Sequence, residues 1–168
     1  MEKKDLSDFA EQTYKVSAEL MVLVSEDKLD WRPSPSGNWW TTGQLLHHLS
    51  YSTGGFVQGV LKGQWPADDG TEAPADEDDF SVSSVADALE RLEADRLLTA
   101  KLLAELPEEE FRNREMCGPR PCEPDYPYPL RKVLHHWVFH QVKHQTMLFA
   151  YLKLLGVEVG TATLYAGD

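Results

Sequence analysis

Apolar residues recur at alternating steps of three and four in four separate stretches of the chain, and this is the period of an amphipathic α-helix. The first stretch covers residues 5–25. Its apolar face consists of Leu6, Phe9, Thr13, Val16, Leu20 and Leu23. The second stretch starts at Thr41 or Thr42, either of which can cap a helix, and continues to about Leu61. Gly54 and Gly55 are expected to weaken and bend its middle.

The third predicted helix starts at Ser83 or Ser84 and ends before Pro107. Its apolar face consists of Val85, Leu89, Leu92, Thr99, Leu103 and Leu106. Arg96 also falls on this face. There it either extends past the edge of the core to solvent or holds a substrate carboxylate.

The fourth predicted helix is the longest and runs from Pro129 to Leu155, with Gly156 as its C-terminal cap. Its inward face is expected to contain Val133, Trp137, His140, His144, Leu148, Tyr151 and Leu155. No convincing alternating strand pattern accompanies the four helices. The chain is therefore predicted to be an all-α four-helix bundle.

Two long connections separate these helices. From residue 63 to residue 80 the chain has seven acidic residues and no basic one, which is typical of a solvated loop. Residues 107–129 contain six prolines and no sustained period, so we expect a long irregular connection of the kind that often shapes a binding site. The connector before the second helix carries three tryptophans, Trp31, Trp39 and Trp40. We expect them to close one end of the core rather than line a ligand site.

Composition narrows the functional classes. A chain of 168 residues with 42% hydrophobic residues suits one folded domain, so residues 1–168 are predicted to form a single domain. The net charge of −12 repels phosphate backbones and anionic membrane surfaces, which disfavours nucleic acid and membranes as partners. Since neither a signal peptide nor an apolar run of about 20 residues is visible, we expect a cytoplasmic protein.

The two cysteines, Cys117 and Cys122, enclose the sequence GPRP. This spacing fits neither a zinc ribbon nor a thioredoxin-type redox pair. We expect a reduced structural pair, with a short-range disulfide as the alternative and a catalytic thiol last.

All six histidines of the chain lie in the second and fourth helices, at positions 47, 48, 135, 136, 140 and 144. His140 and His144 are four residues apart, so a helix places them on one face. His48 lies on the apolar face of the second helix, whereas His47 is about 100° around it and nearer solvent. Several buried imidazoles need a shared partner, and a cation supplies one.

We therefore predict that His48, His140 and His144 bind one divalent metal ion. His136 and His140 are also four residues apart and overlap with the pair His140 and His144. From His136 to His144 the direction of the side chains turns by about 80°, so we do not expect all three to face one ion. His135 and His136 are then expected to flank the site or lie at the surface.

Two segments carry a resemblance to a known family. WRPSPSGNWWTTGQLLHHLS and HQVKHQTMLFAYLKLLG resemble the tryptophan-bearing connector, the histidine helix and the closing motif of the DinB/YfiT-like superfamily. The resemblance implies a bundle with an up-down-down-up connection, a metal triad at His48, His140 and His144, and a homodimer. The chain departs from the family at Gln141, where many members have an acidic residue. It departs again at Met147, where many have glutamine; Gln145 is displaced by two positions.

The leading interpretation is a metal-dependent enzyme with a small-molecule substrate and Zn²⁺ or Ni²⁺ as the ion, because three imidazoles leave coordination positions open. An open position can activate water or hold a thiolate. The resemblance favours a transferase or isomerase that uses a low-molecular-weight thiol such as bacillithiol or mycothiol, with a hydrolase as the alternative. No general base can be assigned; His47, His136 and Tyr151 are candidates by proximity.

Two other readings stay open. A non-catalytic, stress-related metal-binding protein would close the site with a fourth protein ligand. In the other reading, the histidines bond to one another without a metal. If a metal is bound, its affinity should weaken below about pH 6, because only neutral imidazole is a ligand.

Overall fold

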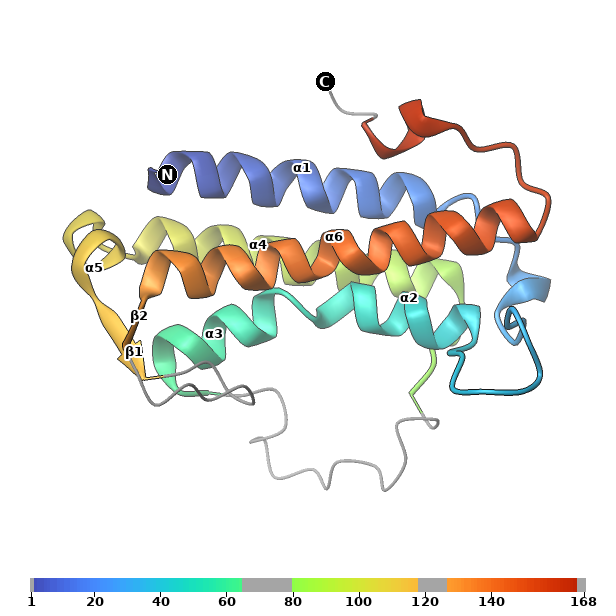
Figure 1. Cartoon of the computed structure of the whole chain (residues 1–168), viewed down its shortest axis with the longest axis horizontal. Helices are drawn as coiled ribbons and strands as arrows, with labels where there is room; N and C mark the ends of the chain where they lie inside the picture. The colour runs from blue at the N-terminus through green and yellow to red at the C-terminus, as the bar shows by residue number, and fades with distance from the viewer. Residues whose placement is uncertain (1, 65–79, 118–126, 166–168) are drawn as a thin grey trace.

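The computed structural model describes residues 2–64, 80–117 and 127–165. Its main elements are α1 (Lys3–Met21), α2 (Thr42–Tyr51), α3 (Gly54–Lys62), α4 (Val85–Glu105) and α6 (Leu130–Leu154). α3 continues the direction of α2, so the five helices form four parallel rods (Figure 1). α1 and α6 run one way along the bundle, and α2–α3 and α4 run the other way. This confirms the predicted all-α bundle and its up-down-down-up connection.

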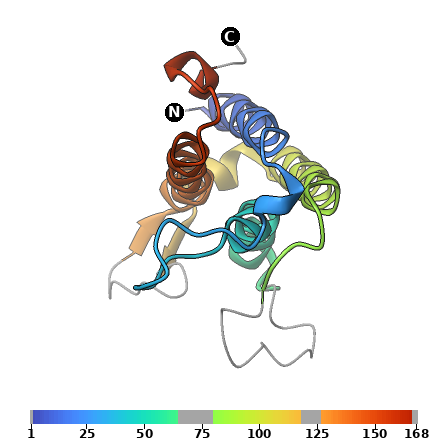
Figure 2. The ribbon, with the colours of Figure 1, turned by 90° about the vertical axis from the view of Figure 1, so that its right-hand side faces the viewer.

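Seen end-on, the rods follow one another around the bundle in the order α1, α4, α2–α3 and α6 (Figure 2). Each rod packs against the next, and α6 closes the ring against α1. The space between α2 and α6 therefore lies diagonally across from the space between α1 and α4. No helix in the described ranges combines the length and apolar composition that a bilayer crossing requires.

Side chains near the helix ends fix where the helices begin and end. Thr41 caps α2: its Oγ1 accepts from the Gln44 N–H at 3.1 Å, and Gln44 Oε1 accepts from the Thr41 N–H at 2.6 Å. Ser84 caps α4 by accepting from the Asp87 N–H at 3.0 Å. Gly156, with φ +80°, ends α6 as predicted.

The second predicted helix is interrupted rather than merely bent. α2 ends at Tyr51 and α3 begins at Gly54, with Ser52 and Thr53 between them. The glycine pair therefore marks a break in the hydrogen-bond ladder. The break frees two backbone N–H groups, and these find a side-chain partner in α4.

The connection from residue 107 to residue 129 differs from the irregular loop that we predicted. It contains a short helix, α5 (Glu108–Asn113), whose Phe111 is fully buried. The two strands β1 (Glu115–Cys117) and β2 (Pro127–Pro129) then pair antiparallel, with Met116 opposite Tyr128. These elements are too short to show a sustained hydrophobic period, and two of the three residues of β2 are prolines. Cys122 and the acidic residues 68–79 lie outside the described residues.

The core consists of two apolar clusters with a polar layer between them. The cluster beside the start of α2 includes Leu20, Leu45, Leu49 and Leu152. The cluster at the α5 end includes Leu6, Val57, Leu102, Leu130 and Leu134. The polar layer, which is buried throughout, consists of Thr13, Ser17, Thr53, Asp95, Thr99, Gln141 and Gln145. One predicted core residue is wrong: Leu23 lies beyond the end of α1 and is 38% exposed.

Candidate metal centre

Three imidazoles from two helices meet between α2 and α6. His48 Nε2 lies 2.9 Å from His140 Nε2, and one ligand nitrogen from each of His48, His140 and His144 lies within 4.8 Å of the others. Ring centroids are 4.3 Å apart for His48 and His144 and 4.5 Å apart for His140 and His144. The three side chains that the sequence analysis selected therefore converge on one point.

The first turn of α2, which precedes His48, is hydrogen-bonded to the connector before it. The Thr42 N–H donates to the carbonyl of Trp31 at 2.8 Å, and the Gly43 N–H donates to the carbonyl of Leu29 at 2.8 Å. A Cβ on Gly43 would lie 2.3 Å from Ser81 Oγ and 3.2 Å from the Leu29 carbonyl oxygen, so a side chain here would have to displace its neighbours. These contacts fix the direction of α2 and hence the position of His48.

A polar contact sets the rotation of α6 about its axis. Gln141 and Gln145 follow the two histidines by one residue and so face about 100° away from them, toward α1. Their amides donate to Ser17 Oγ at 2.9 and 2.8 Å, and Thr53 Oγ1 donates to Gln141 Oε1 at 2.5 Å. Because these buried hydrogen bonds need one helix orientation, they also hold His140 and His144 toward His48.

Burial keeps the three imidazoles neutral. It lowers the pKa of His48 to about 3, and the neighbouring rings of His144 and His140 act in the same direction. Burial, followed by the effects of His140 and Lys143, lowers the pKa of His144 to about 4. The pKa of His140 is also lowered, mainly by burial. At neutral pH all three rings are therefore in the form that binds a cation.

Trp40 covers the triad on the side of the connector. Its ring stacks on His144 with centroids 5.5 Å apart and planes 18° apart, and it is tilted 4.9 Å from His48. Its carbonyl accepts from Tyr151 Oη at 3.1 Å. Trp40 thus packs against the core, as expected of all three tryptophans, and also against two imidazoles of the triad. Trp31 and Trp39 pack against Tyr151 instead.

The remaining histidines do not join the triad. His135 and His136 are exposed on α6, as predicted. His47 is more enclosed than we expected: its ring packs against Phe80 at 5.3 Å and Tyr51 at 4.8 Å, and its Nδ1 is buried without a partner in the described chain. Burial lowers its pKa. Among the suggested bases, Tyr151 uses its hydroxyl on the carbonyl of Trp40, and no general base is assigned.

The donor set fits a divalent ion. Two imidazole nitrogens bound to one tetrahedral Zn²⁺ lie about 3.3 Å apart, since each Zn–N bond is about 2.0–2.1 Å. The distance of 2.9 Å between His48 and His140 needs to open by only a few tenths of an ångström. A hydrogen bond between His48 and His140 does not involve His144, whose Nδ1 is buried without a partner in the described chain. A shared cation accounts for all three rings better than a histidine pair does.

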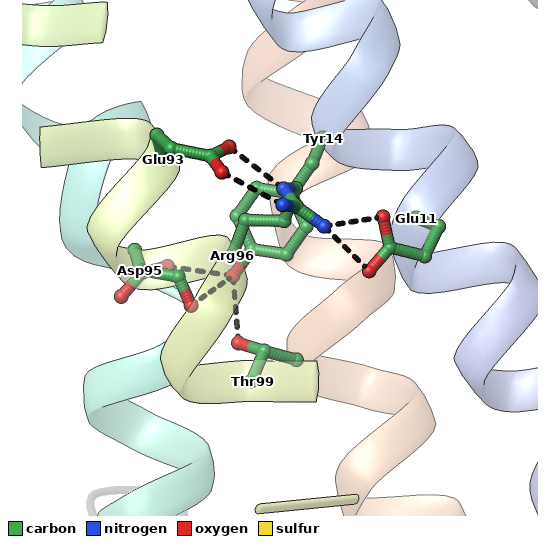
Figure 3. Close-up of polar contacts among 6 residues, drawn as sticks. All are labelled: Glu11, Tyr14, Glu93, Asp95, Arg96 and Thr99. Carbon is green, nitrogen blue, oxygen red and sulfur yellow. Dashed lines mark hydrogen bonds and ion pairs between the residues drawn. The ribbon is translucent and has the colours of Figure 1, made fainter. Parts of the chain in front are cut away.

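A second polar cluster lies across the bundle, and the sequence analysis missed it. Tyr14 Oη donates to Asp95 Oδ2 at 2.7 Å and lies 2.7 Å from Thr99 Oγ1 (Figure 3). The Asp95 carboxylate also accepts from the N–H groups of Gly54 and Gly55, at 2.8 and 3.3 Å. Burial raises the pKa of Asp95, whereas these hydrogen bonds oppose the rise. Asp95 thus caps the start of α3 from a neighbouring helix.

Arg96 extends past the edge of the core, as in the first of the two readings, and its guanidinium is paired with carboxylates of this chain. Its guanidinium pairs with Glu93 at 2.7 Å and with Glu11 at 2.9 Å, and it bridges α4 to α1 (Figure 3). The bridge crosses a groove between α1 and α4 with a volume of about 540 Å³. Since these charges are paired with one another, none of them is left to bind a charged substrate in the groove.

Comparisons with known proteins agree with this architecture. The family model described as "DinB superfamily" matches residues 10–148. The crystal structure of a DinB-like protein, YjoA, from Bacillus subtilis matches with a TM-score of 0.66. The match covers 92% of this chain and 94% of that one at 18% sequence identity, so it supports the fold alone. No curated protein sequence matches significantly.

Proposed function

The chain belongs to the DinB superfamily, and from this premise we propose that it is a metal-dependent enzyme acting on a small molecule. In this proposal His48, His140 and His144 hold one divalent ion, Zn²⁺ or Ni²⁺. The observation that carries the proposal is the convergence of three neutral imidazoles within 4.8 Å. Three such ligands leave at least one coordination position open.

A low-molecular-weight thiol is the proposed second substrate, and the reaction is an S-transfer or isomerisation. A bound divalent ion would lower the pKa of the thiol and hold it as the nucleophilic thiolate. The thiol rests on family resemblance. The residues of this chain contribute position and environment: Trp40 covers two of the imidazoles, and burial keeps the rings unprotonated.

Alanine at His48, His140 or His144 should abolish metal retention, because each change removes one of three ligands. We expect the affinity to fall by more than about 100-fold, beyond the cost of altering a group that only supports a ligand. The measurement is elemental analysis of untagged protein, followed by competition with a chromophoric chelator.

His135→Ala is the matched control, since it removes an exposed histidine from the same helix and should leave the metal content unchanged. Equal loss from His135→Ala and His140→Ala would contradict the assignment. In the same preparations, transfer of small thiols to electrophiles should require His48. Turnover that survives His48→Ala would contradict the proposed chemistry.

A further inference from the structure

Two buried hydrogen-bonding groups beside the triad lack a partner. Ser52 Oγ and Trp137 Nε1 belong to residues that are 0% and 5% exposed, and neither atom has a hydrogen-bond partner in the described chain. Folded proteins pair nearly all such groups, because each unpaired one costs free energy. Two of them, on the helices that carry the triad, indicate that a group outside the described residues pairs with them.

Helical spacing places both groups next to the triad. Ser52 lies four residues after His48, and Trp137 lies three residues before His140. α2 and α6 run in opposite directions, so both steps lead the same way along the bundle (Figure 1). Each group also lies on the same side of its helix as the histidine it accompanies.

Ring contacts fix the level of this pair. Phe56, one turn beyond Ser52, stacks on Trp137 with centroids 4.0 Å apart and planes 5° apart. Trp137 also meets His140 edge-on, with ring centroids 5.7 Å apart. Ser52 lies one turn from Phe56 and one turn from His48. Trp137 contacts Phe56 and His140, so helical spacing puts Ser52 and Trp137 at a similar level along the bundle.

We propose that Ser52 and Trp137 form a hydrogen-bond donor pair that binds the acceptor atom of a small anion held at the triad. This inference rests on the proposed function. The indole N–H can only donate, and the serine hydroxyl can rotate to donate. Three neutral imidazoles and a divalent ion leave the centre positively charged, so an anionic ligand, such as a thiolate, matches it. Both groups are buried, and burial would strengthen hydrogen bonds to such an anion.

Stability separates this role from a purely structural one. If a resident water joined Ser52 and Trp137, removing the hydroxyl would cost stability in every state of the protein. A donor pair kept for a ligand behaves differently, because its unpaired hydroxyl costs free energy until the ligand arrives. Ser52→Ala should therefore leave the melting temperature of the metal-free protein unchanged or raise it.

The experiment uses the cobalt(II)-loaded protein, titrated with azide and with 2-mercaptoethanol while its absorption spectrum is followed. Ser52→Ala and Trp137→Phe should each weaken binding of both anions about tenfold, the effect of losing one hydrogen bond to a charged group. Cobalt affinity itself should stay within about threefold of wild type. Ser50→Ala is the matched control, since the Ser50 hydroxyl is equally buried but donates to the carbonyl of His47 at 2.7 Å. It should lower the melting temperature and leave anion binding unchanged.

Unchanged anion affinity in Ser52→Ala would overturn the inference, whether or not Trp137→Phe folds. A melting temperature lowered as much by Ser52→Ala as by Ser50→Ala would assign the pair to a structural water and overturn it too. Protein that holds no cobalt would contradict the metal proposal itself. The two failures are therefore distinguishable.

Discussion

At the scale of single residues, the candidate metal centre depends on histidines that are neutral because they are buried. A solvent-exposed imidazole has a pKa near 6.5. In the folded chain, burial lowers the pKa of His48 to about 3 and that of His144 to about 4. The ligand set is thus ready at neutral pH without releasing protons. The loss of metal should occur at a lower pH than the value near 6 that free imidazole suggests.

The same pKa values predict how the stability of the metal-free protein depends on pH. Between about pH 6.5 and pH 4 the unfolded chain binds protons at His48 and His144, whereas the folded chain does not. The free energy of unfolding should therefore fall as the pH falls through this window. The limit is about 1.4 kcal/mol per pH unit for each histidine. Urea unfolding at pH 7.5, 6.0 and 5.0 measures the effect.

Carboxylates also titrate at the acidic end of this range, so a variant is needed as a reference. His48→Gln removes one of the buried imidazoles and should flatten the pH dependence between pH 6.5 and pH 5. Identical slopes for wild type and His48→Gln would show that the folded protein does not hold this ring neutral.

At the scale of elements, the break between α2 and α3 is held by one residue of a third helix. Asp95 accepts from the freed N–H groups of Gly54 and Gly55, and its carboxylate is in turn bonded to Tyr14. The close approach of α4 to the break leaves no room for a side chain. A Cβ on Gly54 would lie 2.6 Å from Asp95 Oδ1 and 2.7 Å from the Asp95 carbonyl oxygen.

Gly54→Ala should therefore lower the free energy of unfolding by about 2 kcal/mol, because the backbone of α4 has to move. Denaturant unfolding measures this. Gly160→Ala is the control: nothing lies within 4 Å of its added Cβ, so its effect should stay within about 0.5 kcal/mol. Equal destabilisation by the two variants would show that the contact with Asp95 does not matter.

The elements also show where sequence reasoning succeeds. The four apolar stripes, the caps at Thr41 and Ser84, and the terminal Gly156 are local signals, and the structure confirms them. Asp95 was missed because a carboxylate is normally read as surface. A signal was present: between Leu92 and Thr99 the third stripe lacks an apolar residue for almost two turns, and the gap was assigned to Arg96. The buried residue in this gap is Asp95, the neighbour of Arg96.

The triad was predictable because its spacing is local on α6 and its third member shares the apolar face of α2. The unpaired Ser52 and Trp137 groups were not, since a missing hydrogen bond appears only when the helices are assembled. The same limit applies to the β1–β2 pair. Its strands have three residues each, and two of the three in β2 are prolines, so no alternating pattern can be detected.

At the scale of the whole molecule, a bound ion would connect two rods that are distant in sequence. Binding to the folded state alone raises the free energy of unfolding by about 2.7 kcal/mol at a metal concentration 100 times the Kd. For a chain of this size the melting temperature should rise by about 5–10 °C. Calorimetry with and without Zn²⁺ measures the shift. His140→Ala should show no shift, and a shift of the same size in that variant would place the ion elsewhere.

The expected homodimer stays a prediction.

The net charge of −12 is unevenly distributed over the elements, since α6 carries arginine, lysine and histidine but no acidic residue. The rod that carries His140 and His144 is therefore basic in an acidic protein, and this suits the anionic ligand proposed for the triad.

The division of the triad between α2 and α6 determines when, during synthesis of the chain, the three histidines can come together. During synthesis, residue 48 emerges long before residues 140–144, so a nascent chain has no binding centre until its final long helix has left the ribosome and closed the bundle. A truncated product that lacks α6 cannot assemble the centre. If the triad binds an ion, only molecules in which α6 has joined the bundle can acquire it.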